Sequence, residues 1–192
     1  MTLHRELIAA FAQSEPADVG NVMPDNHSSV GCLWRKIDFS LILNSSGELI
    51  DVDEPPWRMS GRRRRNTLLV PQKQFMGEGV LSGFLWGHSL HALGVGRHGK
   101  AGDLKVNTEA FNRFRTFHRA LLGRHENPSI RALLQFLDRW QPEAVQDGGV
   151  AAQIAGGTVV FRFHYEDRFL HESHAARLIW LRLLNPAGLP AA

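Results

Sequence analysis

The chain has 192 residues, of which 43% are hydrophobic and 21% are charged, so it supports a packed core and excludes wholesale disorder. No apolar run reaches the ~18 residues of a membrane helix, and charged residues interrupt the apolar N-terminal segment, so neither a membrane span nor a secretory signal is expected. A single cysteine, Cys32, excludes an internal disulfide; a buried structural role and a cytoplasmic location are expected for it and for the protein.

The net charge is only +3, but the basic residues are concentrated in the middle of the chain. Residues 1–60 hold four Lys and Arg against nine Asp and Glu, which gives −5. Residues 61–142 hold fourteen against five, which gives +9, and residues 143–192 hold four against five, which gives −1. A basic region attracts a polyanion because binding releases condensed counterions, so this distribution favours a nucleic acid partner. A solvated basic face that only aids solubility remains the alternative.

The N-terminal third is expected to contain a helix, a long loop and a β-hairpin. Apolar residues at helical spacing predict a short amphipathic helix over residues 2–13, and residues 14–30 have loop composition. Residues 34–54 have the pattern of a hairpin, in which KIDFSLILN and ELIDVDE are the strands and NSSG is the turn. The first strand is expected to place these side chains on one face: Ile37, Phe39, Leu41 and Leu43.

Polar and basic segments flank an apolar strand in the next part of the chain. Residues 58–65 predict a basic arm that contains four consecutive arginines, Arg62 to Arg65, and the apolar run Thr67 to Val70 predicts a central strand. Gln72 to Gly83 has the composition of a polar loop, and Phe84 to Val95 predicts a short helix. Trp57, beside two prolines, either stacks on a base or covers a hydrophobic edge.

The polar loop carries the side chains best suited to contact bases. Glutamine can contact adenine and lysine can contact guanine or a phosphate, so Gln72, Lys73 and Gln74 are candidates, although an ordinary hairpin loop remains an alternative. The pattern GxxxxGK[ST] is absent, so nucleotide hydrolysis is not expected. The nearby histidines lack a Cys partner or an HExxH pattern, so structural or surface roles are expected for His88, His91 and His98.

The second half is expected to be mainly helical. Residues 96–107 predict a second flexible basic loop, followed by a helix from Thr108 to about Gly123 and another from Pro128 that Asn127 caps. Residues 144–157 have connector composition, residues 158–165 predict a strand, and residues 171–184 predict a helix. The sequence HESH at residues 171–174 is better explained by a helix that starts near Ser173 than by a metal site. Residues 185–192 have linker composition. The predicted fold is α+β: a mixed, mostly antiparallel sheet built from the hairpin and the strands at 67–70 and 158–165, with helices packed on one side.

No arrangement of residues in the sequence indicates catalysis. Ser-His-Asp, Cys-His and paired-carboxylate combinations do not occur at recognisable spacing, and no site meets the geometric requirements of an active site. The acidic residues Asp51, Asp53 and Glu54 are expected to line a polar strand face rather than a metal site. A binding module without catalytic activity, cofactor or metal is therefore expected, and an uncharacterised hydrolase is the remaining alternative.

An ordered set of segments resembles the N-terminal region of the large subunit of the type I-C CRISPR Cascade, the Csd-subtype member of the Cas-eight group. Their order and separations agree, and they cover nearly the whole chain: residues 34–52, 64–71, 84–95, 111–122, 127–143 and 159–184. Because members of this family are longer, the resemblance implies that residues 1–192 are the N-terminal domain of a longer subunit.

The resemblance implies a role in RNA-guided recognition of DNA. The large subunit reads the short protospacer-adjacent motif on duplex DNA, helps to open the duplex and provides a landing site for the recruited helicase–nuclease, while the guide RNA reads the target by base pairing. The implied partners are double-stranded DNA, the other Cascade subunits and the CRISPR RNA, with no membrane. The alternative is a module that docks on neighbouring subunits or guide RNA without reading DNA.

The chain departs from the family pattern where relatives tend to carry Asn and Asp-Asn, because the positions here are Gly83, Gly87 and His88. The site prediction therefore rests on chemistry and location. Contacts to base edges or the minor groove are predicted for Gln72, Lys73 and Gln74. Phosphate contacts are assigned to basic residues of the arm, the second loop and the helix face: Arg62, Arg63, Arg64, Arg65, Lys100, Lys105, Arg115 and Arg119.

Overall fold

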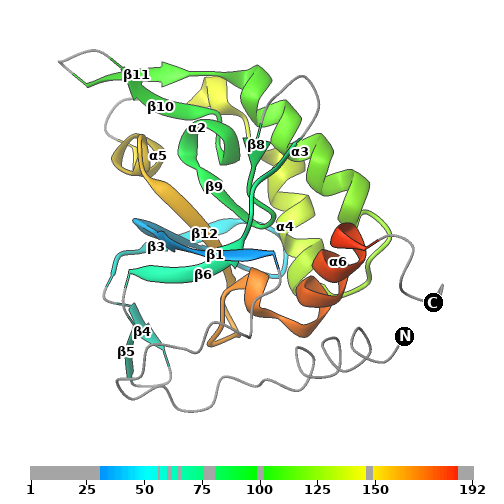
Figure 1. Cartoon of the computed structure of the whole chain (residues 1–192). Helices are drawn as coiled ribbons and strands as arrows, with labels where there is room; N and C mark the ends of the chain where they lie inside the picture. Colours follow the sequence, from blue (N-terminus) through cyan, green and yellow to red (C-terminus); the bar gives the residue numbers. More distant parts are fainter. Residues whose placement is uncertain are drawn as a thin grey trace, which may run out of the picture.

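A four-stranded mixed sheet forms the centre of the protein (Figure 1). The computed structural model describes residues 31–55, 57–59, 62–64, 66–75, 81–98, 102–145 and 149–185. The strand order is β3 (Leu49–Asp53), β2 (Phe39–Leu43), β12 (Thr158–Phe163) and β9 (Trp86–His88). β12 runs parallel to β2, whereas the β2–β3 and β12–β9 pairs are antiparallel. The prediction of an α+β fold with a mixed, mostly antiparallel sheet is confirmed.

The helices cover one face of this sheet. Figure 1 shows α3, α4 and α6 together on the right of the view. Sheet residues such as Leu41 and Phe161 share the main core with Phe114, Leu133 and Trp180 from these helices. Full burial of such a side chain contributes about 1.5–3 kcal/mol, so this layer dominates the stability. The helical elements are α2 (Ser89–Ala92), α3 (Thr108–Leu122), α4 (Pro128–Arg139), α5 (Val150–Ile154) and α6 (His174–Leu184), with 3₁₀ turns η1 (Pro142–Ala144) and η2 (Leu170–Glu172).

A two-stranded ladder lies over the other face of the sheet. β1 (Cys32–Lys36) pairs antiparallel with β6 (Thr67–Pro71). Side chains from this ladder and from the sheet form a second core cluster: Ile37, Trp57, Leu68, Val70, Trp86, Val160 and Phe169. Val160 faces this cluster while Val159 and Phe161 face the helices, because successive residues of a strand point to opposite faces.

The strand at 67–70 was predicted to be central, and this is wrong. Among the described residues β6 pairs with β1, and it is not a member of the four-stranded sheet. Its apolar character comes from Leu68 and Val70, which pack into the second cluster, and from Leu69, which is only partly buried. A short apolar run does not tell a central strand from a strand that covers a sheet.

The predicted hairpin strand KIDFSLILN is interrupted at Ile37 and Asp38. The Asp38 amide donates to the Thr158 carbonyl at 2.8 Å, and Asp38 Oδ2 accepts from the Thr158 amide at 2.9 Å. Ile37 therefore belongs to the second cluster, whereas Leu41 and Leu43 face the helices. The prediction that Ile37 shares a face with Leu41 and Leu43 is wrong. The NSSG turn is confirmed, with Gly47 at a φ of +74°.

Four regions hold structure that local patterns did not predict. Phe84 to Val95 was predicted to be a helix, but it contains β9 followed by the one-turn helix α2. The predicted basic loop at 96–107 is a hairpin of β10 (Val95–His98) and β11 (Asp103–Val106). The predicted connector at 144–157 contains α5, and the polar loop at 72–83 contains the hairpin of β7 (Gln74–Phe75) and β8 (Leu81–Ser82). Strand pairing depends on context that a local pattern does not contain.

The starts of the three long helices are confirmed by their caps. The side chain of Asn107 accepts from the Ala110 amide, that of Asn127 from the Ser129 amide and that of Ser173 from the Ala176 amide. The predicted helix at 2–13, the loop at 14–30 and all but the first residue of 185–192 lie outside the described residues. Within the described part of the chain, no helix has the length and apolar character needed to span a membrane.

Candidate nucleic-acid interface

The β1–β6 ladder has an outward face that carries aromatic, polar and cationic side chains. In its register Trp34 lies opposite Leu69 and Lys36 lies opposite Thr67. Trp34 is 51% exposed, and Lys36 and Thr67 are exposed as well, while the alternate residues of β6 face the second cluster. The Nζ of Lys36 lies 3.5 Å from Asp38 Oδ1, a surface contact of small energetic weight. The outward face therefore presents a half-exposed ring and a cation on a packed support.

The arginine segment is attached to one end of this ladder. Arg62–Arg64 form strand β5, which pairs antiparallel with β4 (Trp57–Met59). Asn66 follows this hairpin, and its carbonyl accepts from the Ile37 amide at 2.7 Å beside the Lys36–Thr67 end of the ladder. Figure 1 shows β4 and β5 at the lower left, below the ladder. The predicted flexible arm is thus a paired hairpin at residues 62–64, while Arg65 lies outside the described residues.

Gln72 and Lys73 lie at the opposite end of the ladder, where backbone contacts hold them. The Gln72 amide donates to the Gly31 carbonyl at 2.7 Å, and Trp86 Nε1 donates to the Pro71 carbonyl at 2.8 Å. The Nζ of Lys73 lies 5.7 Å from the centroid of the Trp86 ring, within the range of a cation–π contact. Gln72 and Lys73 are exposed, whereas Gln74 is half-buried at the start of β7.

His88 has a structural contact, and His91, whose pKa is affected by Lys73, has a lowered pKa. His88 Nδ1 accepts from the Leu90 amide at 3.2 Å and so caps α2, which agrees with the expected structural role. Burial lowers the pKa of His91, and the charges of Lys73 and His88 lower it further. His91 is therefore biased toward the neutral form, and Lys73 supplies the cation at this end of the ladder.

The structure separates the other predicted phosphate contacts from the ladder. Lys105 is exposed on β11, in the hairpin at the top of Figure 1. Arg115 and Arg119 lie on α3; the Cζ of Arg115 is 5.8 Å from the Phe111 ring centroid, and Nη1 of Arg119 is 3.1 Å from Asp138 Oδ1. Lys100 lies outside the described residues. The structure thus joins the arginine hairpin with Gln72 and Lys73, while the DNA contacts of Lys105, Arg115 and Arg119 stay predictions.

The two tryptophans of this region have opposite environments. Trp57 is completely buried and packs edge-on against Phe169 at 5.2 Å between ring centroids, so it covers a hydrophobic edge and is not available to stack on a base. Trp34, which the sequence analysis did not select, is the exposed one. The strand CLWRK carried the signal, since its Trp lies two residues from a lysine on the same face of a strand.

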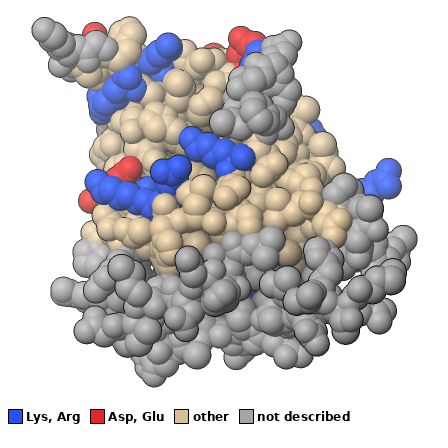
Figure 2. Space-filling model, viewed as in Figure 1, with Lys and Arg blue, Asp and Glu red and all other residues tan. Residues whose placement is uncertain are grey.

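Figure 2 shows the same face of the molecule as Figure 1. Lysine and arginine side chains form separate groups on it, with uncharged surface between them and few acidic side chains. On this face, the described lysine and arginine side chains are therefore separate points and do not form one continuous basic patch. Such spacing suits contacts to individual phosphates.

A family model described as CRISPR-associated protein (Cas_Csd1) matches residues 14–189. The chain belongs to the Csd1 family of CRISPR-associated proteins. This confirms the resemblance to the Csd-type large subunit and places the protein among the components of Cascade-type CRISPR complexes. None of the curated proteins matches the chain.

In this Csd1 protein, the positions that depart from the family pattern have packing roles. A Cβ atom on Gly83 would lie 2.4 Å from the Trp86 ring, so an amide side chain has no room there. A Cβ on Gly87 would lie 3.5 Å from Phe114, and His88 caps α2. Gly83 therefore leaves room for the Trp86 ring, whose contact with Pro71 holds Gln72 and Lys73 at the end of the ladder, whereas the spacing at Gly87 is that of ordinary van der Waals contact.

Proposed function

We propose that this protein is a non-catalytic DNA-binding subunit of a type I-C CRISPR surveillance complex, and that the β1–β6 ladder meets duplex DNA beside the target. The observation that supports this proposal is the position of the ladder. It carries the exposed Trp34 and Lys36, and it joins the strand Arg62–Arg64 at one end to Gln72 and Lys73 at the other. Membership of the Csd1 family supplies the RNA-guided context.

The length of the ladder suits a short sequence motif. From Cys32 to Lys36 the strand rises about 13 Å, at about 3.3 Å per residue. Duplex DNA rises about 3.4 Å per base pair, so the ladder extends along about four base pairs. The division of labour is that of other RNA-guided effectors, in which the protein reads a short flanking motif and the guide RNA reads the target.

The side chains have distinct proposed roles. The arginines of β5, together with Lys36 and Lys73, hold phosphates and fix the register on the duplex. Gln72 contacts a base edge, since its amide carries both a donor and an acceptor. Trp34 stacks on a base that becomes unpaired as the duplex opens. Recruitment of the helicase–nuclease follows this opening.

Two side chains in the described part of the chain, Cys32 and His118, are poorly suited to nucleophilic catalysis. Burial raises the pKa of the Cys32 thiol to about 11, against the smaller opposing effects of Arg177 and Trp180, so the reactive thiolate is scarce at neutral pH. The buried His118 uses both ring nitrogens for backbone contacts, with Leu85 and Phe114. Neither group is available to attack a substrate.

The test is the salt dependence of binding to a flanking-motif duplex by the assembled complex. Replacing Lys36 and Lys73 by alanine removes two proposed phosphate contacts, so the slope of log K against log salt is expected to fall by about 1.8. The matched control replaces Arg124 and Arg131, which are exposed and are not among the predicted contacts, so it also removes two charges and is expected to have a smaller effect. An unchanged slope in the Lys36 and Lys73 variant contradicts the proposal. If that variant also weakens assembly while DNA binding persists, docking on subunits or guide RNA is the better account.

A further inference from the structure

The turn that leads from β8 into β9 has a backbone conformation that side chains rarely adopt. Leu85 has a φ of +64°, and among the described residues every other positive φ belongs to a glycine. The left-handed region costs free energy for a residue with a Cβ atom, so surrounding contacts must hold Leu85 in this conformation. Leu85 is also completely buried, which places the strained backbone inside the core.

His118 of α3 contacts this turn from the helical layer. Its Nε2 accepts from the Leu85 amide at 2.9 Å, so the ring proton lies on Nδ1, which donates to the Phe114 carbonyl at 2.8 Å. The imidazole is fully buried and packs against the rings of Phe84 and Phe114, with 6.0 Å and 4.0 Å between centroids. Its position is therefore fixed, and it supplies the acceptor that the buried Leu85 amide needs.

The residue after Leu85 connects this turn to the ladder. Leu85 belongs to the main core, whereas Trp86 belongs to the second cluster, which side chains of the ladder share. Trp86 Nε1 donates to the Pro71 carbonyl at 2.8 Å, and the Nζ of Lys73 lies 5.7 Å from the centroid of the Trp86 ring. The direction of the backbone at Leu85 therefore sets where the indole meets the segment that carries Lys73.

We propose that His118 is a positioning residue for the DNA-facing surface. By holding the strained turn at Leu85 it fixes the Trp86 indole, and through the indole it fixes Gln72 and Lys73 at the end of the β1–β6 ladder. A change in the helical layer is thus expected to alter DNA affinity, although this layer and the ladder cover opposite faces of the sheet. The consequence for DNA binding rests on the proposed function of the ladder, whereas the link from His118 to Trp86 is measured without DNA.

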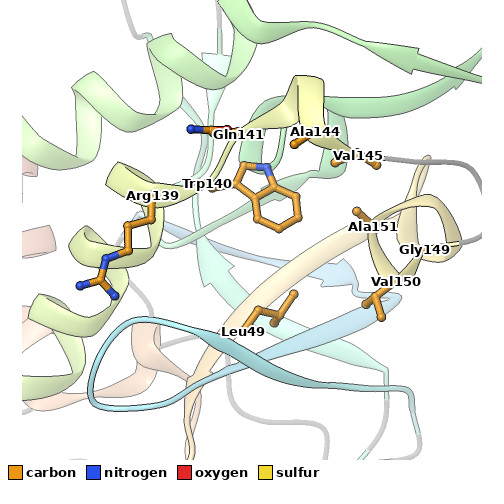
Figure 3. Close-up of a pocket in the computed structure, with 9 residues that line it drawn as sticks. All are labelled: Leu49, Arg139, Trp140, Gln141, Ala144, Val145, Gly149, Val150 and Ala151. Carbon is orange, nitrogen blue, oxygen red and sulfur yellow. The ribbon is translucent and has the colours of Figure 1, made fainter.

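Trp140 provides a matched control at the other end of residues 84–95. Its Nε1 donates to the Leu93 carbonyl at 2.7 Å, so it is a second indole that bonds a backbone carbonyl. In Figure 3 its ring lies in the middle of the residues that line a mainly apolar recess of about 480 Å³. The described residues that line this recess come from β3, α4, η1, α5 and the residues beside them, and not from the ladder. Loss of the Trp140 bond is therefore expected to lower stability and to leave DNA affinity unchanged.

The first test measures the free chain by NMR. The indole N–H resonance of Trp86, assigned with Trp86→Phe among the five tryptophans, is expected to shift and to exchange faster with solvent in His118→Phe, which keeps a ring but loses the acceptor. In His118→Gln the side-chain carbonyl accepts from the Leu85 amide, so the resonance should return toward its original position. In Trp140→Phe it should not move. An unchanged Trp86 resonance in folded His118→Phe overturns the proposal.

If His118→Phe does not fold, a pH titration of the unchanged chain decides the same point. Burial lowers the pKa of His118 to about 4, so the ring gains a proton as the pH falls toward that value, and Nε2 then no longer accepts. The Trp86 indole resonance should move together with the ring resonances of His118, while the Trp140 indole resonance stays. Independent movement of the Trp86 and His118 resonances would refute the link between them.

The second test measures binding of the flanking-motif duplex by the assembled complex. His118→Phe is expected to weaken binding about fivefold, or about 1 kcal/mol. The same loss is expected in a Lys36→Ala background, at the other end of the ladder. Little further loss is expected where Gln72 and Lys73 are already alanine, because residues that act through one another are not additive.

The outcomes separate the positioning role from the proposed function. An equal loss in the Gln72 and Lys73 background, or an equal loss from Trp140→Phe, would overturn the positioning role of His118. If the Gln72 and Lys73 pair itself leaves DNA binding unchanged while the Trp86 resonance depends on His118, the contact chain stands and the proposed function fails at this end of the ladder.

Discussion

The outward face of the β1–β6 ladder and the edge strand β3 both expose apolar side chains, but the charged residues beside them have opposite signs. Trp34 shares the outward face with Lys36, and the arginine strand β5 precedes the ladder at one end, whereas Ile50 lies on a strand with acidic neighbours. The comparison teaches that an exposed apolar residue is best interpreted with its charged surroundings. A ring beside cations suits nucleic acid, whereas carboxylates beside an aliphatic side chain repel the phosphate backbone.

The largest expected effect is on the ladder side. Replacing Arg62, Arg63 and Arg64 by alanine is expected to weaken binding of the flanking-motif duplex at least about 100-fold, because hydrogen bonds to charged groups contribute about 1.5–3 kcal/mol each. The control removes three exposed arginines elsewhere: Arg124, Arg131 and Arg182. Fluorescence anisotropy on assembled complexes measures both. Comparable losses in the two variants would mean that general charge, and not the ladder, carries the binding.

Trp34→Ala is expected to weaken binding to DNA that has an unpaired base beside the motif by roughly 30-fold, since stacking contributes about 1–3 kcal/mol per base. Binding to a fully paired duplex should change less, and Trp34→Phe should restore most of the affinity. Association with the other subunits should not change, which separates DNA contact from assembly. A uniform loss on both DNAs would argue against stacking.

The pH dependence of stability tests the core that supports β9 and, through Trp86, the ladder. Burial lowers the pKa of His118 to about 4, and its Nε2 accepts from the Leu85 amide at 2.9 Å. Protonation of Nε2 removes this acceptor. The unfolded chain binds the proton near its ordinary pKa of about 6.5, so stability is complete above that pH and falls as the pH drops toward 4.

The expected slope in this window is up to about 1.4 kcal/mol per pH unit. Urea unfolding at a series of pH values between 4 and 7 measures it. His118→Gln is expected to be less stable at pH 7 but to have a smaller slope, because the titrating group is gone. An equal slope in the variant would assign the pH dependence to other groups.

The smallest expected effect on DNA affinity comes from Trp86→Phe, which removes the 2.8 Å hydrogen bond to the Pro71 carbonyl and replaces the indole by a smaller aromatic ring. We expect a loss of about 1 kcal/mol in stability and a few-fold loss of DNA affinity through Lys73. Association with neighbouring subunits should stay the same. If subunit association falls and DNA affinity does not, the contact serves assembly and not DNA binding.

Local signals predicted the long helices and the class of the fold, but not the arrangement of the strands. Asn127 and Ser173 cap their helices as predicted, and Asn107 caps the helix that was predicted to begin at Thr108, because caps depend on a few neighbouring residues. The pairing of β1 with β6 joins residues more than thirty positions apart, for example Cys32 with Pro71. Local patterns do not specify such contacts, so the sequence analysis assigned residues 67–70 to the centre of the sheet.

The candidate site was predictable in part for the same reason. Cation-rich and amide-rich segments are visible in the sequence, so the arginine run and Gln72 with Lys73 could be selected as candidates, and their DNA contacts stay predictions. The connection of these segments and the exposure of Trp34 both depend on the pairing of β1 with β6, which local patterns do not show. For the same reason the sequence analysis considered Trp57 for base stacking and did not consider Trp34. A basic residue in a cation-rich segment can also have a structural role that the sequence does not show. Arg97 is an example, since its guanidinium donates to the carbonyls of Gly102 and Ala152.

Photocrosslinking tests the central claim most directly. Benzoylphenylalanine placed at position 34 in the assembled complex should crosslink to a duplex that carries the flanking motif, and the same group at position 165, which is also exposed, should not. Crosslinks from position 34 to protein alone, or equal DNA crosslinks from both positions, would contradict the assignment of the β1–β6 ladder as the DNA-facing surface.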